Sequence, residues 1–182
     1  APRHAGHIRN YNSALAAIDN AEYVFLCAGM GGGLAKNLRE PATLCSETLN
    51  LVNRVCRAAF IRAVRRLVWF SCACVYPVLD RPATEQDLWG GPLEPTSRAF
   101  AAATLAGIEL TRAYNEQHGE EFLVLVSPTL YGPGDEFGEY GHVLAAMIRK
   151  CHEAKVAGAS EVVFWGSGRQ RRQFLYVEDL AG

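Results

Sequence analysis

The sequence lacks the features that mark several large classes of protein. No apolar run approaches the roughly 18 residues that a membrane-spanning helix needs, and residues 1–10 lack the apolar core of a signal peptide. The formal net charge is only −1, so no general attraction to nucleic acid or to an acidic membrane is expected. Internal repeats and low-complexity segments are absent as well. We therefore expect a globular, cytoplasmic protein with neither a nucleic-acid nor a membrane partner.

The six cysteines form no C-x-x-C pair, and their spacing fits no zinc pattern, so no metal site is expected. Most stand in apolar segments, where a free cysteine of a reducing compartment behaves as a small hydrophobic residue. Cys74 is the exception, because it ends the apolar run that begins at Leu67 and precedes a Tyr-Pro turn. Ligands of open α/β sheets bind beyond the carboxyl ends of strands. The sequence therefore predicts a functional site around Cys74.

Apolar runs with strand character alternate with segments of helical periodicity along the chain. We expect strands at residues 22–28, 67–74, 121–126 and 161–165, with a last strand and the start of a helix within residues 173–182. We expect helices at residues 13–20, 41–59, 97–118 and 141–157. This alternation predicts the α/β class, with a mostly parallel, doubly wound, Rossmann-like sheet in a single domain over residues 1–182.

Two connecting segments stand out between these elements. Residues 77–95 form a Pro/Gly-rich loop of a length that is usually functional or mobile. Residues 29–33, GMGGG, follow the first expected strand, where glycines can let the backbone approach a phosphate. Their spacing is not G-x-G-x-x-G, and a tight turn or a flexible crossing loop is the alternative.

An ordered set of motifs runs through the chain: CVYP (74–77), EPTSRAFAAATLAG (94–107), LYGPGDEF (130–137), HVLAAMIRKCHEA (142–154), WGSG (165–168) and RRQFLYVEDLA (171–181). This set resembles the extended short-chain dehydrogenases, most closely the GDP-L-fucose synthase branch. That branch comprises 3,5-epimerases that are also NADPH-dependent 4-reductases of GDP-4-keto-6-deoxymannose. The resemblance implies an incomplete domain, which lacks the N-terminal dinucleotide-binding βαβ unit and in which residues 133–182 begin the nucleotide-sugar-binding region.

Several positions depart from the family pattern. The catalytic Tyr-x-x-x-Lys of the family falls on Phe100 and Thr104, its catalytic serine falls on Cys72, and an asparagine near the nicotinamide and substrate falls on Thr129. Phenylalanine cannot donate a proton, and threonine cannot hold the ribose hydroxyls as lysine does. We therefore expect that hydride transfer is lost, that NADPH does not bind, and that the chain uses no cofactor.

Other positions match the family. Cys74 falls on its epimerisation cysteine and His142 on its acid/base histidine. Lys150, Trp165 and Arg172 fall on positions that hold GDP and its diphosphate, with lysine in place of the usual arginine. A point charge replaces a planar fork there, so geometric specificity for the diphosphate weakens. The resemblance thus implies a GDP-type nucleotide sugar as ligand.

Epimerisation next to a ketone needs no nicotinamide, since a base removes the acidic C–H proton and an acid returns one on the other face. Thiols and imidazoles suit this exchange because their reference pKa values of about 8.5 and 6.5 bracket neutral pH. One hypothesis is therefore a redox-silent epimerase that uses Cys74 and His142. Its weak point is the developing enolate, because the family's two hydroxyl donors are Phe100 and Cys72 here. The alternative is a catalytically inactive nucleotide-sugar-binding protein, or a partner subunit or fragment of a GDP-L-fucose synthase-like protein.

The strand expected at residues 22–28 raises a separate question about partners. Without a neighbouring strand on its other side, this apolar strand would be an exposed sheet edge, which is an aggregation hazard. Another chain, strand exchange in a homodimer, or the arm of residues 1–13 could cover it. The family dimerises through helices that correspond to residues 41–59 and 97–118, and the Ala-rich second helix suits close helix packing within the domain or across a dimer.

Overall fold

The computed structural model describes residues 8–29, 33–138 and 141–182. Three parallel strands form the main sheet: β1 (Tyr23–Leu26), β2 (Arg66–Cys72) and β3 (Leu123–Ser127), in the order β1-β2-β3. A second, two-stranded parallel sheet joins β4 (Thr129–Tyr131) to β5 (Phe174–Tyr176). The expected α/β class and parallel pairing are confirmed, with the strands divided between two sheets.

Several of the helix ends have clear capping residues. They are α1 (Tyr11–Ala17), α2 (Gly33–Arg39), α3 (Pro41–Ile61), α4 (Arg98–His118), α5 (Val143–Ala157) and α6 (Val177–Ala181). Asn10 and Ser13 form a capping box at the start of α1, and Pro41 occupies the first turn of α3. Gly119 and Gly158 end α4 and α5 in the left-handed conformation that glycine adopts without strain. No described helix is long and apolar enough to cross a membrane.

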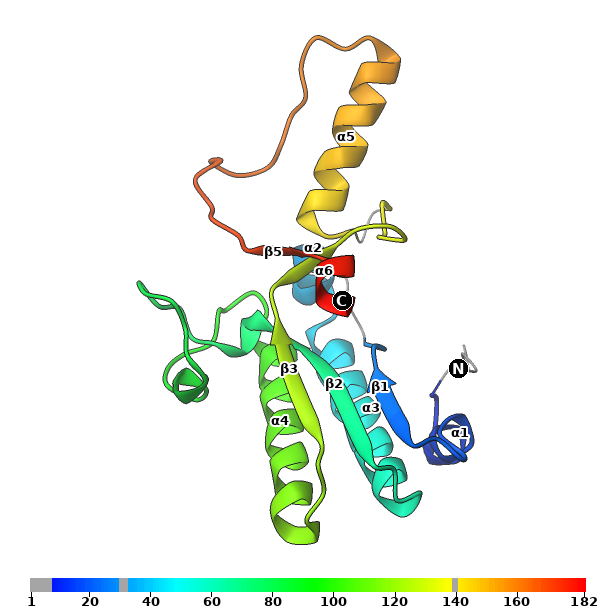
Figure 1. Ribbon diagram of the computed structural model, residues 1–182. Coiled ribbons are helices and arrows are strands. Elements are labelled where there is room, and N and C mark those ends of the chain that lie inside the picture. The colour runs from blue at the N-terminus through cyan, green and yellow to red at the C-terminus, as the bar shows by residue number, and fades with distance from the viewer. Residues whose placement is uncertain (1–7, 30–32, 139–140) are drawn as a thin grey trace.

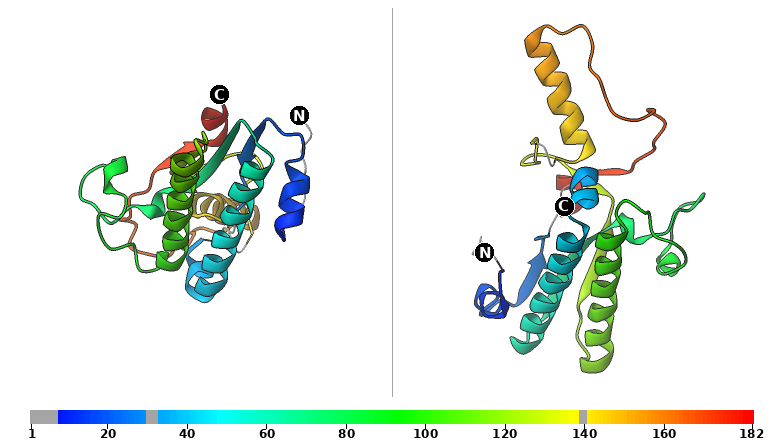
Figure 2. Two further views of the ribbon diagram at one scale, coloured as in Figure 1. Left: turned by 90° about the horizontal axis from the view of Figure 1, so that it is seen from below. Right: turned by 180° about the vertical axis from the view of Figure 1, so that it is seen from behind.

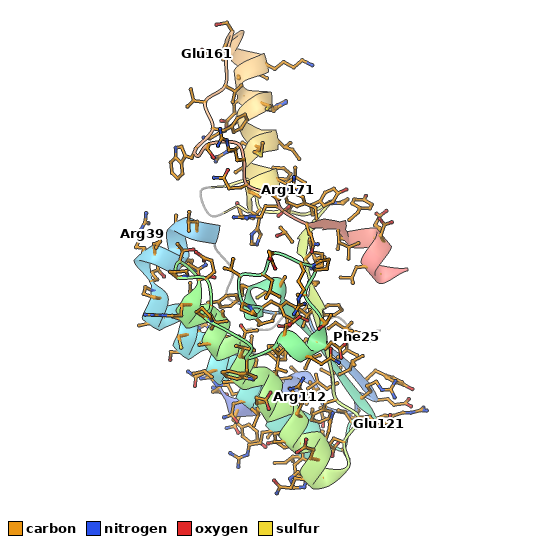
Figure 3. The ribbon with its side chains drawn as sticks, turned by 90° about the vertical axis from the view of Figure 1, so that its left-hand side faces the viewer. Phe25, Arg39, Arg112, Glu121, Glu161 and Arg171 are labelled. Atoms are coloured by element: carbon orange, nitrogen blue, oxygen red, sulfur yellow. The ribbon has the colours of Figure 1, made fainter. Side chains whose placement is uncertain are left out.

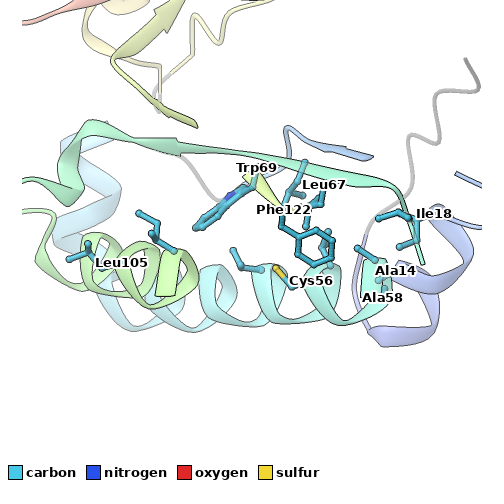
Figure 4. Close-up of a cluster of buried hydrophobic side chains, with 14 of the residues drawn as sticks. Ala14, Ile18, Cys56, Ala58, Leu67, Trp69, Leu105 and Phe122 are labelled. Carbon is cyan, nitrogen blue, oxygen red and sulfur yellow. The ribbon is translucent and has the colours of Figure 1, made fainter. Parts of the chain in front are cut away.

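Helices α3 and α4 lie side by side over one face of the main sheet (Figures 1 and 2). Figure 4 shows Leu67 and Trp69 pointing from β2 toward these helices, where they join the buried core. Gly107 permits the close approach in α4, because a Cβ there would lie 2.7 Å from the Trp69 ring and 3.1 Å from Val52. The Ala-rich helix therefore packs closely within the chain.

The opposite face of the main sheet carries large apolar side chains that remain accessible. Tyr23 is 48% exposed, Phe25 is 63% exposed and Leu123 is 45% exposed. Within the part of the chain that the structure describes, β1 is an edge strand, as the sequence predicts. No described helix lies over this face in the views of Figures 1 and 2.

The structure corrects four local expectations. Residues 161–165 form no strand, because no described strand pairs with them and most of their side chains are exposed. Residues 129–131, expected within a loop, pair as β4 instead. The helix α2 was not expected, and the strand expected to reach residue 74 ends at Cys72 and continues as a 3₁₀ turn, Ala73–Val75. Most of the glycine-rich segment, residues 30–32, lies outside the described residues.

Candidate functional site

The two cysteines at the carboxyl end of β2 face one another. Cys72 keeps extended backbone (φ −127°, ψ 152°), and the 3₁₀ turn that follows places Cys74 on the same side of the chain. Their sulfur atoms lie 2.7 Å apart, and both residues are half-buried. The predicted site therefore contains a thiol pair rather than one cysteine.

The N-terminal part of α4 supplies two further predicted positions. Thr104 is only 2% exposed, and its Oγ1 donates a hydrogen bond of 2.9 Å to the carbonyl oxygen of Phe100. Phe100 is half-buried one helical turn earlier. The Thr104 hydroxyl also lies close enough to Cys72 to lower the pKa of that thiol. The structure thus brings together Cys72, Cys74 and Thr104, all expected from the sequence to belong to one site.

The two thiols have opposite electrostatic environments. The hydrogen bond from Cys74 lowers the pKa of Cys72, although burial opposes this effect. The hydrogen bond with Cys72 and burial together raise the pKa of Cys74 far above its ordinary value. At neutral pH, Cys74 therefore holds the proton, and Cys72 is the thiol that ionises first.

Glu94 is a site residue that the sequence reasoning missed. Its carboxylate accepts hydrogen bonds from the Ser97 backbone N–H at 3.1 Å and from the Thr96 hydroxyl, and these bonds lower its pKa. The resulting negative charge adds to the causes that raise the pKa of Cys74. The signal was available in the sequence, since an acidic residue shortly before a helix start commonly binds the free backbone N–H groups there.

Two of the predicted nucleotide-binding residues meet beside α5. The ammonium nitrogen of Lys150 lies 5.6 Å from the centre of the Trp165 ring and 5.8 Å from that of Phe164. The same nitrogen donates a hydrogen bond of 3.1 Å to the Val163 carbonyl. Figure 3 shows the chain returning from Glu161, at the far end of α5, toward Arg171 near its base. Trp165 is 88% exposed, so one lysine charge and a free aromatic face stand together.

The remaining predicted residues lie apart from these two groups. His142 is exposed and is the N-cap of α5, although its side chain makes no capping hydrogen bond. The described residues show no contact between His142 and Cys74. Arg172 is exposed and donates a hydrogen bond of 3.0 Å to the Arg171 carbonyl. Thr129 is half-buried and begins β4, opposite Phe174 of β5.

The other cysteines differ in burial. Cys56 is buried in the core, as expected of a packing residue, whereas Cys27 and Cys151 are exposed, against that expectation. No cluster of three or more His, Cys, Asp or Glu side chains that could hold a metal ion occurs among residues 8–29, 33–138 and 141–182.

Comparison with known proteins adds a family to this geometry. The sequence pattern of the NAD dependent epimerase/dehydratase family matches residues 2–182. A probable GDP-L-fucose synthase of Oryza sativa subsp. japonica is 42% identical over 92% of this chain, and the GDP-L-fucose synthase of Escherichia coli is 36% identical over 91%. In each case the match covers 52% of the relative, so the chain spans about half the length of these curated relatives.

Solved structures give the same result. A GDP-L-fucose synthetase from Naegleria fowleri, determined with NADP bound, superposes with a TM-score of 0.84 and is 31% identical. That superposition covers 97% of this chain and 59% of the other. The Rossmann-like fold expected from the sequence is therefore confirmed.

Proposed function

Because the chain belongs to the NAD dependent epimerase/dehydratase family, we propose that it binds a GDP-type nucleotide sugar and exchanges a proton beside the sugar's ketone without transferring hydride. The contact between Cys72 and Cys74 is the observation that carries this proposal. It leaves a protonated thiol at the carboxyl end of a central strand, where ligands of open α/β sheets bind.

The nucleotide half of the proposal rests on Lys150 and Trp165. A base can stack on the open face of Trp165, while the neighbouring ammonium group attracts a phosphate. Arg172 adds positive charge on the same returning segment, and the GDP-type base is inferred from the names of the relatives.

The proton-transfer half assigns separate roles to Cys74 and His142. The raised pKa of Cys74 keeps its proton in place at neutral pH, so this thiol returns a proton to the carbon beside the ketone. His142 is the second acid/base side chain of the proposal, and it is assigned the removal of the proton. The described structure has His142 exposed on α5, and the proposal requires that bound substrate bridges the two residues.

Hydride transfer is excluded from the proposal because the residues present do not fit a nicotinamide cofactor. NADP supplies hydride chemistry to the reductases of this family when it is bound. Here Thr104 is buried and its hydroxyl is held by the Phe100 carbonyl, so it presents no group to ribose hydroxyls. The Phe100 side chain has no acidic proton to give.

A second candidate function is binding without turnover. An enolate oxygen needs hydrogen-bond donors, and the loss of one such donor costs on the order of 10²–10³ in rate. Cys72 replaces one donor with a weakly donating thiol, and the lowered pKa of Cys72 favours a thiolate that repels an enolate. The chain would then be a nucleotide-sugar-binding partner or an inactive relative of the synthases.

The deciding experiment follows solvent deuterium into GDP-4-keto-6-deoxymannose by NMR, without any nicotinamide. We expect exchange at C3 or C5 with the unmodified protein and its loss in Cys74→Ser and in His142→Ala. His152→Ala is the matched control, since this histidine is exposed on the same helix, and it should exchange normally. Binding of the sugar nucleotide without exchange would support the second candidate, and exchange that survives in Cys74→Ser would refute the assigned roles.

A further inference from the structure

We propose that Cys72 and Cys74 form a reversible disulfide that switches the site off when the protein meets a peroxide. The blocking effect rests on the proposed function of Cys74, whereas the disulfide itself does not. The two residues thus act as an oxidation site in addition to their place in proton transfer.

The geometry of the strand end prepares this bond. Alternate residues of a strand face the same side, and the 3₁₀ turn after Cys72 brings the second sulfur back toward the first. A disulfide bond is about 2.05 Å long. The sulfur atoms already lie 2.7 Å apart, so they need to approach by less than 1 Å. Only Ala73 separates the two residues, so the bond would close a small ring within this one turn of the chain.

The pair also has the asymmetry that thiol oxidation requires. Peroxides attack thiolates, and Cys72 is the member of the pair with the lowered pKa. Cys74 keeps its proton and lies in position as the resolving thiol. Neither residue is fully buried, so a small oxidant can reach the pair.

Hydrogen peroxide balances the reaction. The Cys72 thiolate attacks one peroxide oxygen, the O–O bond breaks, and Cys72 becomes a sulfenic acid as hydroxide leaves. The Cys74 sulfur then attacks the Cys72 sulfur, the S–O bond breaks, and the disulfide forms. The Cys74 proton and one solvent proton convert the two released hydroxide groups to water. Two thiols are oxidised by two electrons, and one peroxide is reduced to two waters.

No other two cysteines of the described residues have contacting sulfur atoms, so the modification should be selective. Cys56 is buried in the core, where burial raises its pKa to about 11. Cys27 and Cys151 are exposed and singly placed, so their oxidation would link two molecules rather than close a bond within one.

The consequence for the site is direct. In the disulfide, the Cys74 sulfur carries no proton and cannot return one to the substrate. The nucleotide-binding residues on α5 and the segment after it take no part in the bond. Oxidation should therefore abolish proton exchange while leaving nucleotide binding in place.

The test uses the full chain carrying Cys27→Ser, Cys45→Ser and Cys151→Ser, which retains Cys56, Cys72 and Cys74. After hydrogen peroxide treatment, we expect a mass loss of two hydrogens, a peptide that links Cys72 to Cys74, and full reversal by dithiothreitol. Either Cys72→Ser or Cys74→Ser in this background should abolish the mass loss, with circular dichroism confirming that each variant is folded. Sulfinic acid at Cys72, or no change at either residue, would refute the proposal.

Deuterium exchange measured on the same samples separates this inference from the proposed function. Exchange in the reduced protein that disappears on oxidation and returns on reduction supports the switch. The disulfide could also form in a protein whose reduced form binds nucleotide but shows no proton exchange. That result would overturn the switch and the proposed catalysis, while the oxidation site would stand. Exchange without a disulfide would overturn the oxidation site alone.

Discussion

The hydroxyl of Thr104 donates a hydrogen bond to the carbonyl oxygen of Phe100, one helical turn earlier, at 2.9 Å. The sequence resemblance implies that the two residues stand at the positions where the extended short-chain dehydrogenases carry their tyrosine and lysine. Here the Thr104 hydroxyl bonds to a backbone carbonyl of its own helix, and Thr104 is packed into the interior. The Thr104 side chain therefore has a structural role in α4, since it is buried and bonded to the backbone of its own helix.

Introducing a lysine at position 104 should destabilise the fold. Thr104 is 2% exposed, and its hydroxyl donates its hydrogen bond to a backbone carbonyl rather than to a carboxylate. Thr104→Lys would therefore bury a charged group without an ion-pair partner. We expect the free energy of unfolding to fall by roughly 3–5 kcal/mol, the cost of an uncompensated buried charge. Thr104→Val, which loses only the hydrogen bond, should cost about 1 kcal/mol. Urea denaturation of both variants and the parent is the measurement. A Thr104→Lys variant as stable as the parent would show that the position opens to solvent.

NADPH should not bind measurably. By the sequence resemblance, the family's ribose-binding and proton-donating groups fall on Thr104 and Phe100. The Thr104 hydroxyl is buried and donates to the Phe100 carbonyl, and the Phe100 side chain has no polar atom. A titration followed by NADPH fluorescence is expected to show no saturation, with GDP as the ligand that does bind. Saturable binding at micromolar NADPH would contradict our account of the replaced residues.

Removing either cysteine should change the rate at which the other is alkylated. The hydrogen bond with Cys72 is the largest cause of the raised pKa of Cys74, so Cys72→Ala should let Cys74 ionise at lower pH. Its alkylation by iodoacetamide at a fixed pH near 8 should then become faster. Cys74→Ala removes the bond that lowers the pKa of Cys72, so Cys72 should ionise at higher pH and react more slowly at neutral pH.

Each unit of pKa changes the thiolate fraction about tenfold below the pKa, so effects of at least severalfold are expected. Rates measured by mass spectrometry from pH 6 to pH 9 decide the matter, and Cys151→Ser serves as a control with both rates unchanged. If the remaining cysteine of each alanine variant had the same rate profile as that cysteine in the parent, the sulfur atoms would not interact in solution.

Nucleotide binding should depend on the aromatic and basic groups beside α5. We expect Trp165→Ala to weaken GDP binding by about 1–3 kcal/mol, the usual worth of stacking between a base and an aromatic side chain. Lys150→Ala should weaken binding in the same direction and reduce its salt dependence. Calorimetry gives the affinities. Trp89→Ala and Lys155→Ala are matched controls, since both side chains are exposed away from the Lys150–Trp165 contact. GDP affinities within twofold of the parent in all four variants would show that the nucleotide binds away from Lys150 and Trp165.

The uncovered sheet face should promote association. Phe25 is 63% exposed on the edge strand β1, next to the exposed Tyr23, so Phe25→Lys should reduce self-association and keep the melting temperature within a few degrees. Sedimentation velocity over a range of concentrations measures the effect. Val78→Lys is the control, because Val78 is 77% exposed on a loop away from the sheet. A parent protein that stays monomeric at every concentration would show that this face needs no cover.

The sequence predicted the main sheet and its long helices because their signals are local. Pro41 starts α3, Gly119 follows the end of α4, and the buried positions Val52, Val55, Cys56 and Ala59 of α3 follow the predicted helical spacing. The strand expected at residues 161–165 was wrong because an apolar run becomes a strand only where another strand pairs with it. The Pro/Gly-rich segment that contains β4 was taken for a loop for the converse reason, since its partner β5 lies more than forty residues away.

Of the residues predicted for the site, the structure brings Cys72, Cys74 and Thr104 together, and the sequence did not predict the electrostatics of the two thiols. Cys72 and Cys74 stand two residues apart in an expected strand, a spacing that places two side chains on one face, yet the sequence gives no distance between their sulfur atoms. Glu94 escaped notice because its effect on Cys74 depends on how the long loop returns to the start of α4. The contact of Lys150 with Trp165 likewise depends on the path of residues 158–165 beside the helix.

The pairing of β4 with β5 closes the chain at the base of an excursion that contains α5 and the segment carrying Trp165. The chain enters and leaves that excursion through two adjacent three-residue strands, so the excursion is joined to the rest of the molecule at one place. Residues within it can change, lengthen or be exchanged without repacking Trp69 and its neighbours. The proposed nucleotide site and the thiol pair are therefore separable for evolution, and one can be altered or lost while the other persists.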